Sequence, residues 1–154
     1  MDMMERIKRV LEGHPEVAFA YLFGSWAKGR QGPTSDIDVA VWFHESVHDR
    51  LKAQLKLMGE LGAALGTDNL DLVVLNDATL SLRYIVQRDG ILACERDRRA
   101  RIAFEARTRR EYWDFEPLLK VYRDFMRRRM EAGRYGTGLD RKVRKVRKGV
   151  AKAG

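Results

Sequence analysis

The sequence lacks the features that mark secreted and membrane proteins. Its single cysteine, Cys94, excludes a disulfide within the chain and favours a reducing compartment. No apolar run approaches the roughly 20 residues that span a bilayer. The N-terminus also lacks the basic and then apolar segments of a signal peptide. We therefore expect a soluble, cytoplasmic protein without a membrane partner.

An acidic excess is absent too, because 30 Lys and Arg residues outnumber 22 Asp and Glu residues and give a net charge of +8. The positive excess is concentrated at one end. Residues 134–154 contain eight basic residues and one acidic residue, whereas residues 1–133 contain 22 basic and 21 acidic residues. We predict a nearly neutral domain over residues 1–132 and a basic, flexible tail over residues 133–154. Nucleic acid or an acidic partner would bind only through this tail.

Hydrophobic periodicity predicts an α/β (α+β) domain, with a small mixed sheet flanked by helices. The expected helices cover residues 3–11, 47–65 and 97–130, with a further helix that Asp77 or Thr79 caps and that ends at Gln87. The expected strands cover residues 17–23, 36–43, 70–75 and 91–94. Pro117 lies inside the last helical segment. We therefore expect either a kink in a long C-terminal helix or two helices that meet near Glu116.

Two helical segments carry apolar stripes. In the segment 47–65 the stripe is expected to face the core, and its members are Val47, Leu51, Leu55, Met58, Leu61 and Leu65. The stripe of the last helix has two interpretations, packing against the sheet or binding a partner. Its members are Trp113, Phe115, Leu118, Leu119, Tyr122, Phe125, Met126 and Met130.

Three acidic residues interrupt otherwise apolar strands. Asp36 and Asp38 lie two residues apart, so both carboxylates project from one face of a strand. Without a partner this placement costs on the order of several kcal/mol. Asp71 repeats the anomaly in the segment 70–75. If the two strands are neighbours, the three carboxylates converge and suffice for a site with two divalent cations.

A glycine and a serine precede these acids. Gly24 and Ser25 end one strand and open a helical turn, where free N–H groups and a hydroxyl suit a phosphate. Taken alone, the pair also fits an ordinary turn with a capping serine. Lys28 and Arg30 follow in the loop, where they either contact a triphosphate or remain solvated. An anion site followed by carboxylates suits a nucleoside triphosphate bound as its Mg²⁺ complex.

The order of these residues is similar to a known signature. Gly24, Ser25, ten intervening residues, Asp36 and Asp38 resemble the DNA polymerase β-like nucleotidyltransferase superfamily, and Asp71 matches its third carboxylate. The short chain is most similar to the minimal nucleotidyltransferases. The segments 83–90 and 101–123 resemble the MntA-type antitoxins that pair with HEPN-fold ribonuclease toxins such as HepT.

This resemblance implies an antitoxin that transfers AMP from ATP to a tyrosine hydroxyl of a cognate HEPN toxin and forms a hetero-oligomer with it. Gly24 and Ser25 would hold the phosphates, helped by Lys28 and Arg30. Asp36 and Asp38 would bind both of two Mg²⁺ ions. Asp71 would complete the second metal site and help to deprotonate the hydroxyl.

Two other functions remain open at this point. Aminoglycoside-type nucleotidyltransferases modify a small-molecule hydroxyl, but they carry an additional helical domain for which this chain has little length. A non-catalytic module that binds the toxin is the second alternative. His44 and His48 have a spacing that can hold zinc on a helix, although neighbouring acids favour an exposed polar face. Cys94 is expected to be a packed thiol.

Overall fold

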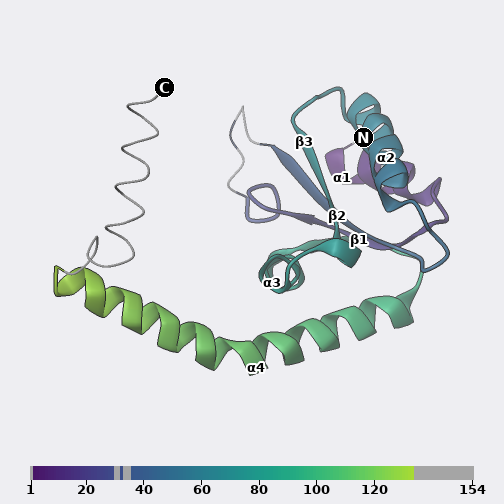
Figure 1. Ribbon diagram of the computed structural model, residues 1–154. Coiled ribbons are helices and arrows are strands. Elements are labelled where there is room, and N and C mark those ends of the chain that lie inside the picture. The colour runs from purple at the N-terminus through teal and green to yellow at the C-terminus, as the bar shows by residue number, and fades with distance from the viewer. Residues whose placement is uncertain (1, 30–31, 33–35, 134–154) are drawn as a thin grey trace, which may run out of the picture. The chain divides into compact units, whose positions relative to one another are not determined.

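The computed structural model describes residues 2–29, 32 and 36–133. The predicted tail, except Gly133, lies outside the described residues. In chain order the elements are α1 (Met3–Glu12), β1 (Val17–Phe23), β2 (Ile37–Phe43), α2 (Arg50–Leu65), β3 (Leu70–Val74), the short 3₁₀ helix η1 (Leu75–Asp77), α3 (Leu80–Asp89), β4 (Ile91–Glu95) and α4 (Arg98–Glu131) (Figure 1). The chain divides into two units, residues 1–112 and residues 113–154, which are described separately.

The sheet of the first unit is mixed, as predicted. Its strand order is β3-β2-β1-β4, and β1 pairs antiparallel with both β2 and β4. β2 and β3 are parallel, so the chain must cross over between them, and α2 forms that crossover. Because the central strands β1 and β2 are antiparallel, the end of β1 and the start of β2 lie at the same end of the sheet, and the turn after β1 leads back to β2.

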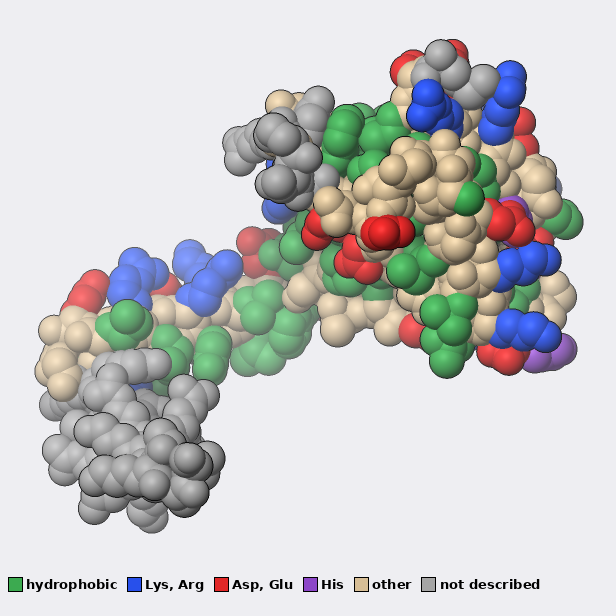
Figure 2. Space-filling view, turned by 90° about the horizontal axis from the view of Figure 1, so that it is seen from above, with side chains coloured by type: hydrophobic (Ala, Val, Ile, Leu, Met, Phe, Trp, Pro, Cys, Tyr) green, Lys and Arg blue, Asp and Glu red, His purple; other side chains and the backbone are tan. Residues whose placement is uncertain are grey.

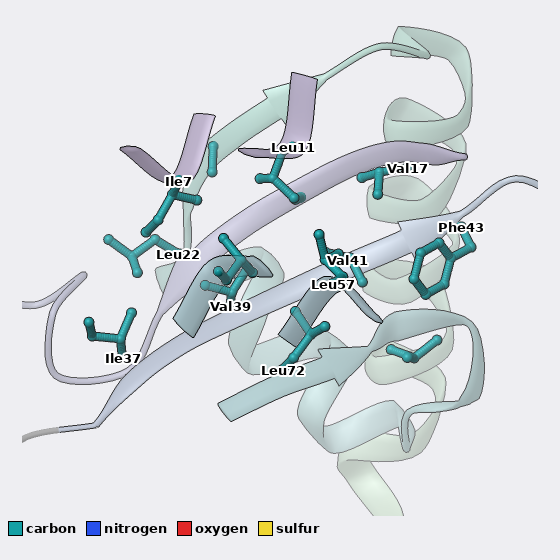
Figure 3. Close-up of a cluster of buried hydrophobic side chains, with 14 residues drawn as sticks. Ile7, Leu11, Val17, Leu22, Ile37, Val39, Val41, Phe43, Leu57 and Leu72 are labelled. Carbon is teal, nitrogen blue, oxygen red and sulfur yellow. The ribbon is translucent and has the colours of Figure 1, made fainter. Parts of the chain in front are cut away.

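Each face of the sheet is covered by helices (Figure 1). α1 and α2 cover one face, where Ile7, Leu11 and Leu57 pack against Val39 and Val41 of β2 (Figure 3). On the other face, aromatic side chains of β1 pack with α3 and the first turns of α4. This second cluster contains Ala18, Phe19, Tyr21, Phe23, Ala40, Leu75, Val86 and Phe104. Since Ala40 belongs to the second cluster, the strand alternation assigns Asp38 to the same face.

The predicted apolar stripe of residues 47–65 is confirmed at four positions and wrong at two. Leu61 is buried, and Val47, Met58 and Leu65 pack against the core. α2 begins at Arg50, because the Asp49 side chain accepts a hydrogen bond from the backbone of Lys52. Leu51 and Leu55 are 65% and 59% exposed, and the buried leucines are Leu57 and Leu61. The Gln54 side chain faces the sheet and donates a hydrogen bond to the carbonyl of Leu72 at 2.7 Å.

α4 continues through Pro117, so the alternative of two helices meeting near Glu116 is wrong, and a long C-terminal helix is confirmed. Proline removes one main-chain hydrogen bond, but the turns on both sides remain formed and outweigh that loss in a helix of 34 residues. Among the helices of the described part of the chain, none has the length and apolar character required to cross a bilayer.

Candidate active site

The three acidic residues come together at one end of the sheet. Asp38 of β2 and Asp71 of β3 are direct partners in the parallel register, and Asp36 immediately precedes β2. The expectation that the two acidic strands are neighbours is therefore confirmed. Asp36 and Asp71 are exposed, whereas Asp38 is half-buried. One carboxylate of the group is thus partly desolvated, while the other two face solvent.

The carboxylates repel one another. Burial raises the pKa of Asp38, and the negative charges of Asp71 and Asp36 raise it further. Within the described ranges, no residue forms a hydrogen bond or an ion pair with any of these three carboxylates. The same ranges contain no ready-formed cluster of three metal-ligating side chains, so the acids do not already close around one point. Uncompensated oxygen ligands of this kind fit a hard divalent cation such as Mg²⁺.

Gly24 connects these acids to the turn that follows β1. Phe23 is paired with Asp38 across β1 and β2, and Gly24 then adopts a left-handed φ of 74°. A Cβ atom at Gly24 would lie 2.2 Å from Oδ2 of Asp38, so the backbone of the turn is directly beside the carboxylate. Only glycine combines this conformation with this approach. The predicted phosphate and metal residues therefore share one site.

The turn itself forms a single helical turn, as predicted. The backbone N–H of Lys28 donates to the carbonyl of Gly24 at 3.2 Å, and Ser25 lies half-buried between them. The Lys28 ammonium lies 3.3 Å from Oδ2 of Asp89 and is 43% exposed. Arg30 lies outside the described residues. The structure thus brings Gly24, Ser25 and Lys28 to the end of the sheet that holds Asp38.

Asp89 is the residue at this site that the sequence pattern did not reveal. Arg88 binds its carboxylate with two hydrogen bonds of 2.9 and 2.8 Å, and hydrogen bonds from Arg88 and then Lys28 lower the pKa of Asp89 to about 2. If Lys28 moves away from Asp89, the Asp89 carboxylate therefore remains paired with Arg88. An acid at the end of α3 is a weak signal by itself, since its partner Lys28 is distant in the sequence.

The other candidate groups remain outside this site. Cys94 is half-buried, and burial raises the pKa of its thiol, which agrees with the prediction of a packed side chain. His44 is half-buried and His48 is exposed. The described residues around them form no metal-ligating group of three, so the structure adds nothing to the zinc hypothesis.

Comparison with known proteins then decides the family. Residues 5–99 match the family model described as polymerase beta, nucleotidyltransferase, which covers more than half of the chain. The chain belongs to this nucleotidyltransferase family. The matched residues of the nucleotidyltransferase include Gly24, Ser25 and all three acidic residues, so the family and the fold predicted from them are confirmed.

Individual relatives of this chain carry more specific names than the family does. The protein adenylyltransferase MntA of Shewanella oneidensis is 38% identical over 84 residues, which make up 54% of this nucleotidyltransferase and 58% of MntA. The match thus spans about three fifths of that curated relative. A chain of a toxin-antitoxin crystal structure with AMP-PNP is 27% identical, with a TM-score of 0.67 over 80% of this chain and 97% of its own. A chain of the MntA-HepT toxin-antitoxin structure is 25% identical, with a TM-score of 0.61 over 80% and 96% of the two chains.

Proposed function

We propose that this nucleotidyltransferase is an antitoxin that transfers AMP from ATP to a tyrosine hydroxyl of a cognate HEPN ribonuclease toxin and thereby neutralises it. The observation that carries the proposal is the group of three carboxylates, in which Asp38 and Asp71 are register partners and Gly24 lies against Asp38. Support for the acceptor comes from the relatives, one named a protein adenylyltransferase and others solved as toxin-antitoxin structures.

The reaction forms one bond and breaks one bond. The tyrosine oxygen attacks the α-phosphorus of ATP, the bond from that phosphorus to the oxygen bridging to the β-phosphate breaks, and pyrophosphate leaves. A tyrosine hydroxyl titrates near pH 10, so its proton must be accepted by a base during the attack. We assign this role to Asp71, which is exposed and adjacent to Asp38 across the two parallel strands.

Asp36 and Asp38 would hold two Mg²⁺ ions, and Asp71 would complete the second site. When bound, Mg²⁺ neutralises phosphate charge and makes the attacking hydroxyl more acidic. The chain contributes the negative charge that such binding requires. Because burial and the charges of Asp71 and Asp36 raise the pKa of Asp38, a cation between them relieves the same repulsion.

The turn Gly24–Gly29 would hold the β- and γ-phosphates. Gly24 lets the backbone approach closely, Ser25 supplies a hydroxyl, and Lys28 supplies a positive charge when it exchanges Asp89 for a phosphate oxygen. Arg88 keeps its two hydrogen bonds to Asp89 during that exchange. We also propose that the protein works in the cytoplasm as part of a hetero-oligomer, where ATP and a ribonuclease toxin would both be present.

The test is to incubate the protein with the HEPN-fold product of the neighbouring gene and ATP, and to measure the intact mass of both proteins. We expect the toxin to gain one or more AMP units and to lose ribonuclease activity. Asp36→Asn with Asp38→Asn should abolish the gain, whereas Asp68→Asn, an exposed acid before β3, should preserve it. Neutralisation by the double variant without any mass gain would instead indicate a non-catalytic binding module.

A further inference from the structure

The carboxylate of Asp89 is shared by two basic side chains. Charged side chains of both signs are scattered over the surface of the first unit (Figure 2), and a single exposed ion pair among them contributes little. The Asp89 side chain, in contrast, is only 19% exposed, and it binds Lys28 at 3.3 Å as well as Arg88 through two hydrogen bonds. Lys28 belongs to the turn after β1, whereas Arg88 belongs to α3. Asp89 therefore connects the candidate phosphate site to a helix that packs against the sheet.

The end of α3 lies in direct contact with the sheet, which fixes the position of Asp89. Gly90 follows Asp89, and its backbone N–H donates to the carbonyl of Val86 at 2.8 Å. A Cβ atom at Gly90 would lie 2.4 Å from that carbonyl oxygen and 3.2 Å from Cβ of Tyr21 in β1. Only a residue without a side chain allows this close approach. The backbone beside Asp89 is therefore held against β1, and the carboxylate extends from a fixed point.

Arg88 is held on two sides. Its guanidinium donates to both oxygens of Asp89 at 2.9 and 2.8 Å, and it lies 5.5 Å from the ring centroid of Tyr84. The Tyr84 ring stacks on Tyr112, the last residue of the first unit, with centroids 3.6 Å apart and an interplanar angle of 2°. A guanidinium that stacks on a ring and binds a carboxylate through two hydrogen bonds has little freedom to reorient. Arg88 is thus the fixed partner of Asp89, whereas Lys28, which is 43% exposed, is the partner that can exchange.

These contacts determine how readily Lys28 can turn to a phosphate. Without a nucleotide, the Lys28 ammonium is paired with Asp89. When a phosphate oxygen takes its place, Asp89 keeps both hydrogen bonds from Arg88. If Arg88 were removed, the same exchange would leave a poorly exposed carboxylate without a cation, and this is more unfavourable than the loss of an exposed pair.

We propose that Arg88, held by the ring of Tyr84, is a positioning residue for AMP transfer, which keeps Asp89 paired so that Lys28 waits beside the phosphate-binding turn and is released to ATP. This proposal rests on the proposed function, because it takes ATP as the ligand of that turn. In this role Arg88 touches neither the nucleotide nor the reacting atoms, and it acts only through Asp89 and Lys28. It therefore governs the affinity for ATP and not the rate of the chemical step.

The experiment measures by calorimetry how the full chain binds α,β-methylene-ATP with Mg²⁺, an analogue whose bond between the α- and β-phosphates the enzyme cannot break. We expect Arg88→Gln, which preserves helix propensity, to raise the Kd for this analogue about tenfold. The kcat for AMP transfer at saturating ATP should stay within about twofold of wild type, because Lys28 reaches the phosphate in both proteins once ATP is bound. A general loss of structure would instead lower kcat as well.

Arg107→Gln is the matched control. Glu111 also binds two arginines, Arg107 at 2.7 Å and Arg83 at 3.1 Å, so this variant too removes one of two cations from a carboxylate. Within the described part of the chain, none of these three residues is hydrogen-bonded or paired with Lys28 or with Asp89. The control variant should bind the analogue as wild type does.

A second background separates positioning from direct attraction between Arg88 and the nucleotide. Lys28→Met removes the cation that exchanges, so adding Arg88→Gln to this variant should not change its Kd for the analogue further. Direct attraction would persist without Lys28 and would give the same rise of about tenfold in both backgrounds. That result would overturn the proposal, and so would an unchanged Kd in the single variant Arg88→Gln.

The part played by Tyr84 is tested by two substitutions that differ in the ring. Tyr84→Phe retains the ring and should bind the analogue as wild type does, whereas Tyr84→Leu removes it and should raise the Kd about threefold. Equal Kd values in these two variants would show that the ring does not position Arg88. Circular dichroism of every variant checks that the fold is retained.

Failure of the proposed function has a different signature. In that case the wild type would bind the analogue and Arg88→Gln would weaken this binding, but no AMP would be transferred to the toxin. Failure of the positioning proposal would instead leave AMP transfer to the toxin in place while Arg88→Gln and wild type bind the analogue equally.

Discussion

At the scale of single residues, Gly24 determines whether the turn and the carboxylates can share one site. We expect Gly24→Ala to reduce AMP transfer about 100-fold or more, because its Cβ would lie 2.2 Å from Oδ2 of Asp38 and displace that carboxylate. Gly29→Ala is the matched control. Gly29 has a similar φ of 68°, but a Cβ atom there meets no atom within 4 Å. Both variants thus strain the backbone, and only the first disturbs Asp38. Equal losses of AMP transfer in the two variants, measured with labelled ATP, would attribute the effect to backbone strain alone.

At the scale of the helices and strands, His14 joins the turn before β1 to α2. The residue is 6% exposed, and its imidazole contacts the carboxylates of Glu16 and Glu60. Burial opposes the charged imidazolium, but the hydrogen bonds and charges of the two carboxylates outweigh it and raise the pKa of His14. A raised pKa stabilises the fold fully below the unfolded pKa of about 6.5, and this stability is lost as the pH rises through the folded value.

The resulting prediction concerns the pH dependence of unfolding. As the pH rises above about 6.5, the urea midpoint of the wild type should fall, and His14→Gln should flatten this part of the profile. Replacing His48, an exposed histidine, with Gln should leave the slope unchanged and serves as the control. A wild-type midpoint that stays constant or rises over this range would show that the contacts with Glu16 and Glu60 do not favour the imidazolium.

The same scale explains which features could be predicted from the sequence. Asp38 and Asp71 stood out because each interrupts a short apolar strand, whereas Asp36, expected on the same strand as Asp38, lies immediately before it. The crossover through α2 makes the two strands neighbours. The exposure of Leu51 and Leu55 could not be predicted, since it depends on how α2 packs against the sheet, which Gln54 contacts through its hydrogen bond to Leu72. The ion pair of Lys28 with Asp89 could not be predicted either, because it joins two elements that are distant in the sequence. Local periodicity records which side chains are apolar, whereas these contacts depend on how separate elements meet.

At the scale of the whole molecule, charge and chemistry are divided between the two units of the chain. Residues 1–112 are neutral overall and include the acidic site, while residues 113–154 carry the net charge of +8. Such a charge accelerates encounter with an acidic partner, and salt screens this effect. The association rate constant for the toxin should therefore fall steeply with ionic strength. The KM for ATP should not depend on the basic segment, because ATP would bind at the site that contains Asp38.

A full-length variant with neutral residues in the basic segment separates these two effects. The variant replaces six residues with glutamine, namely Arg141, Lys142, Arg144, Lys145, Arg147 and Lys148. We expect its association rate with the toxin, measured by stopped flow at low salt, to fall about tenfold or more and to lose most of its salt dependence. Its dissociation rate should change much less, because long-range charge acts mainly on the rate of encounter. An unchanged association rate at low salt would mean that the positive charge of the second unit does not act on this partner.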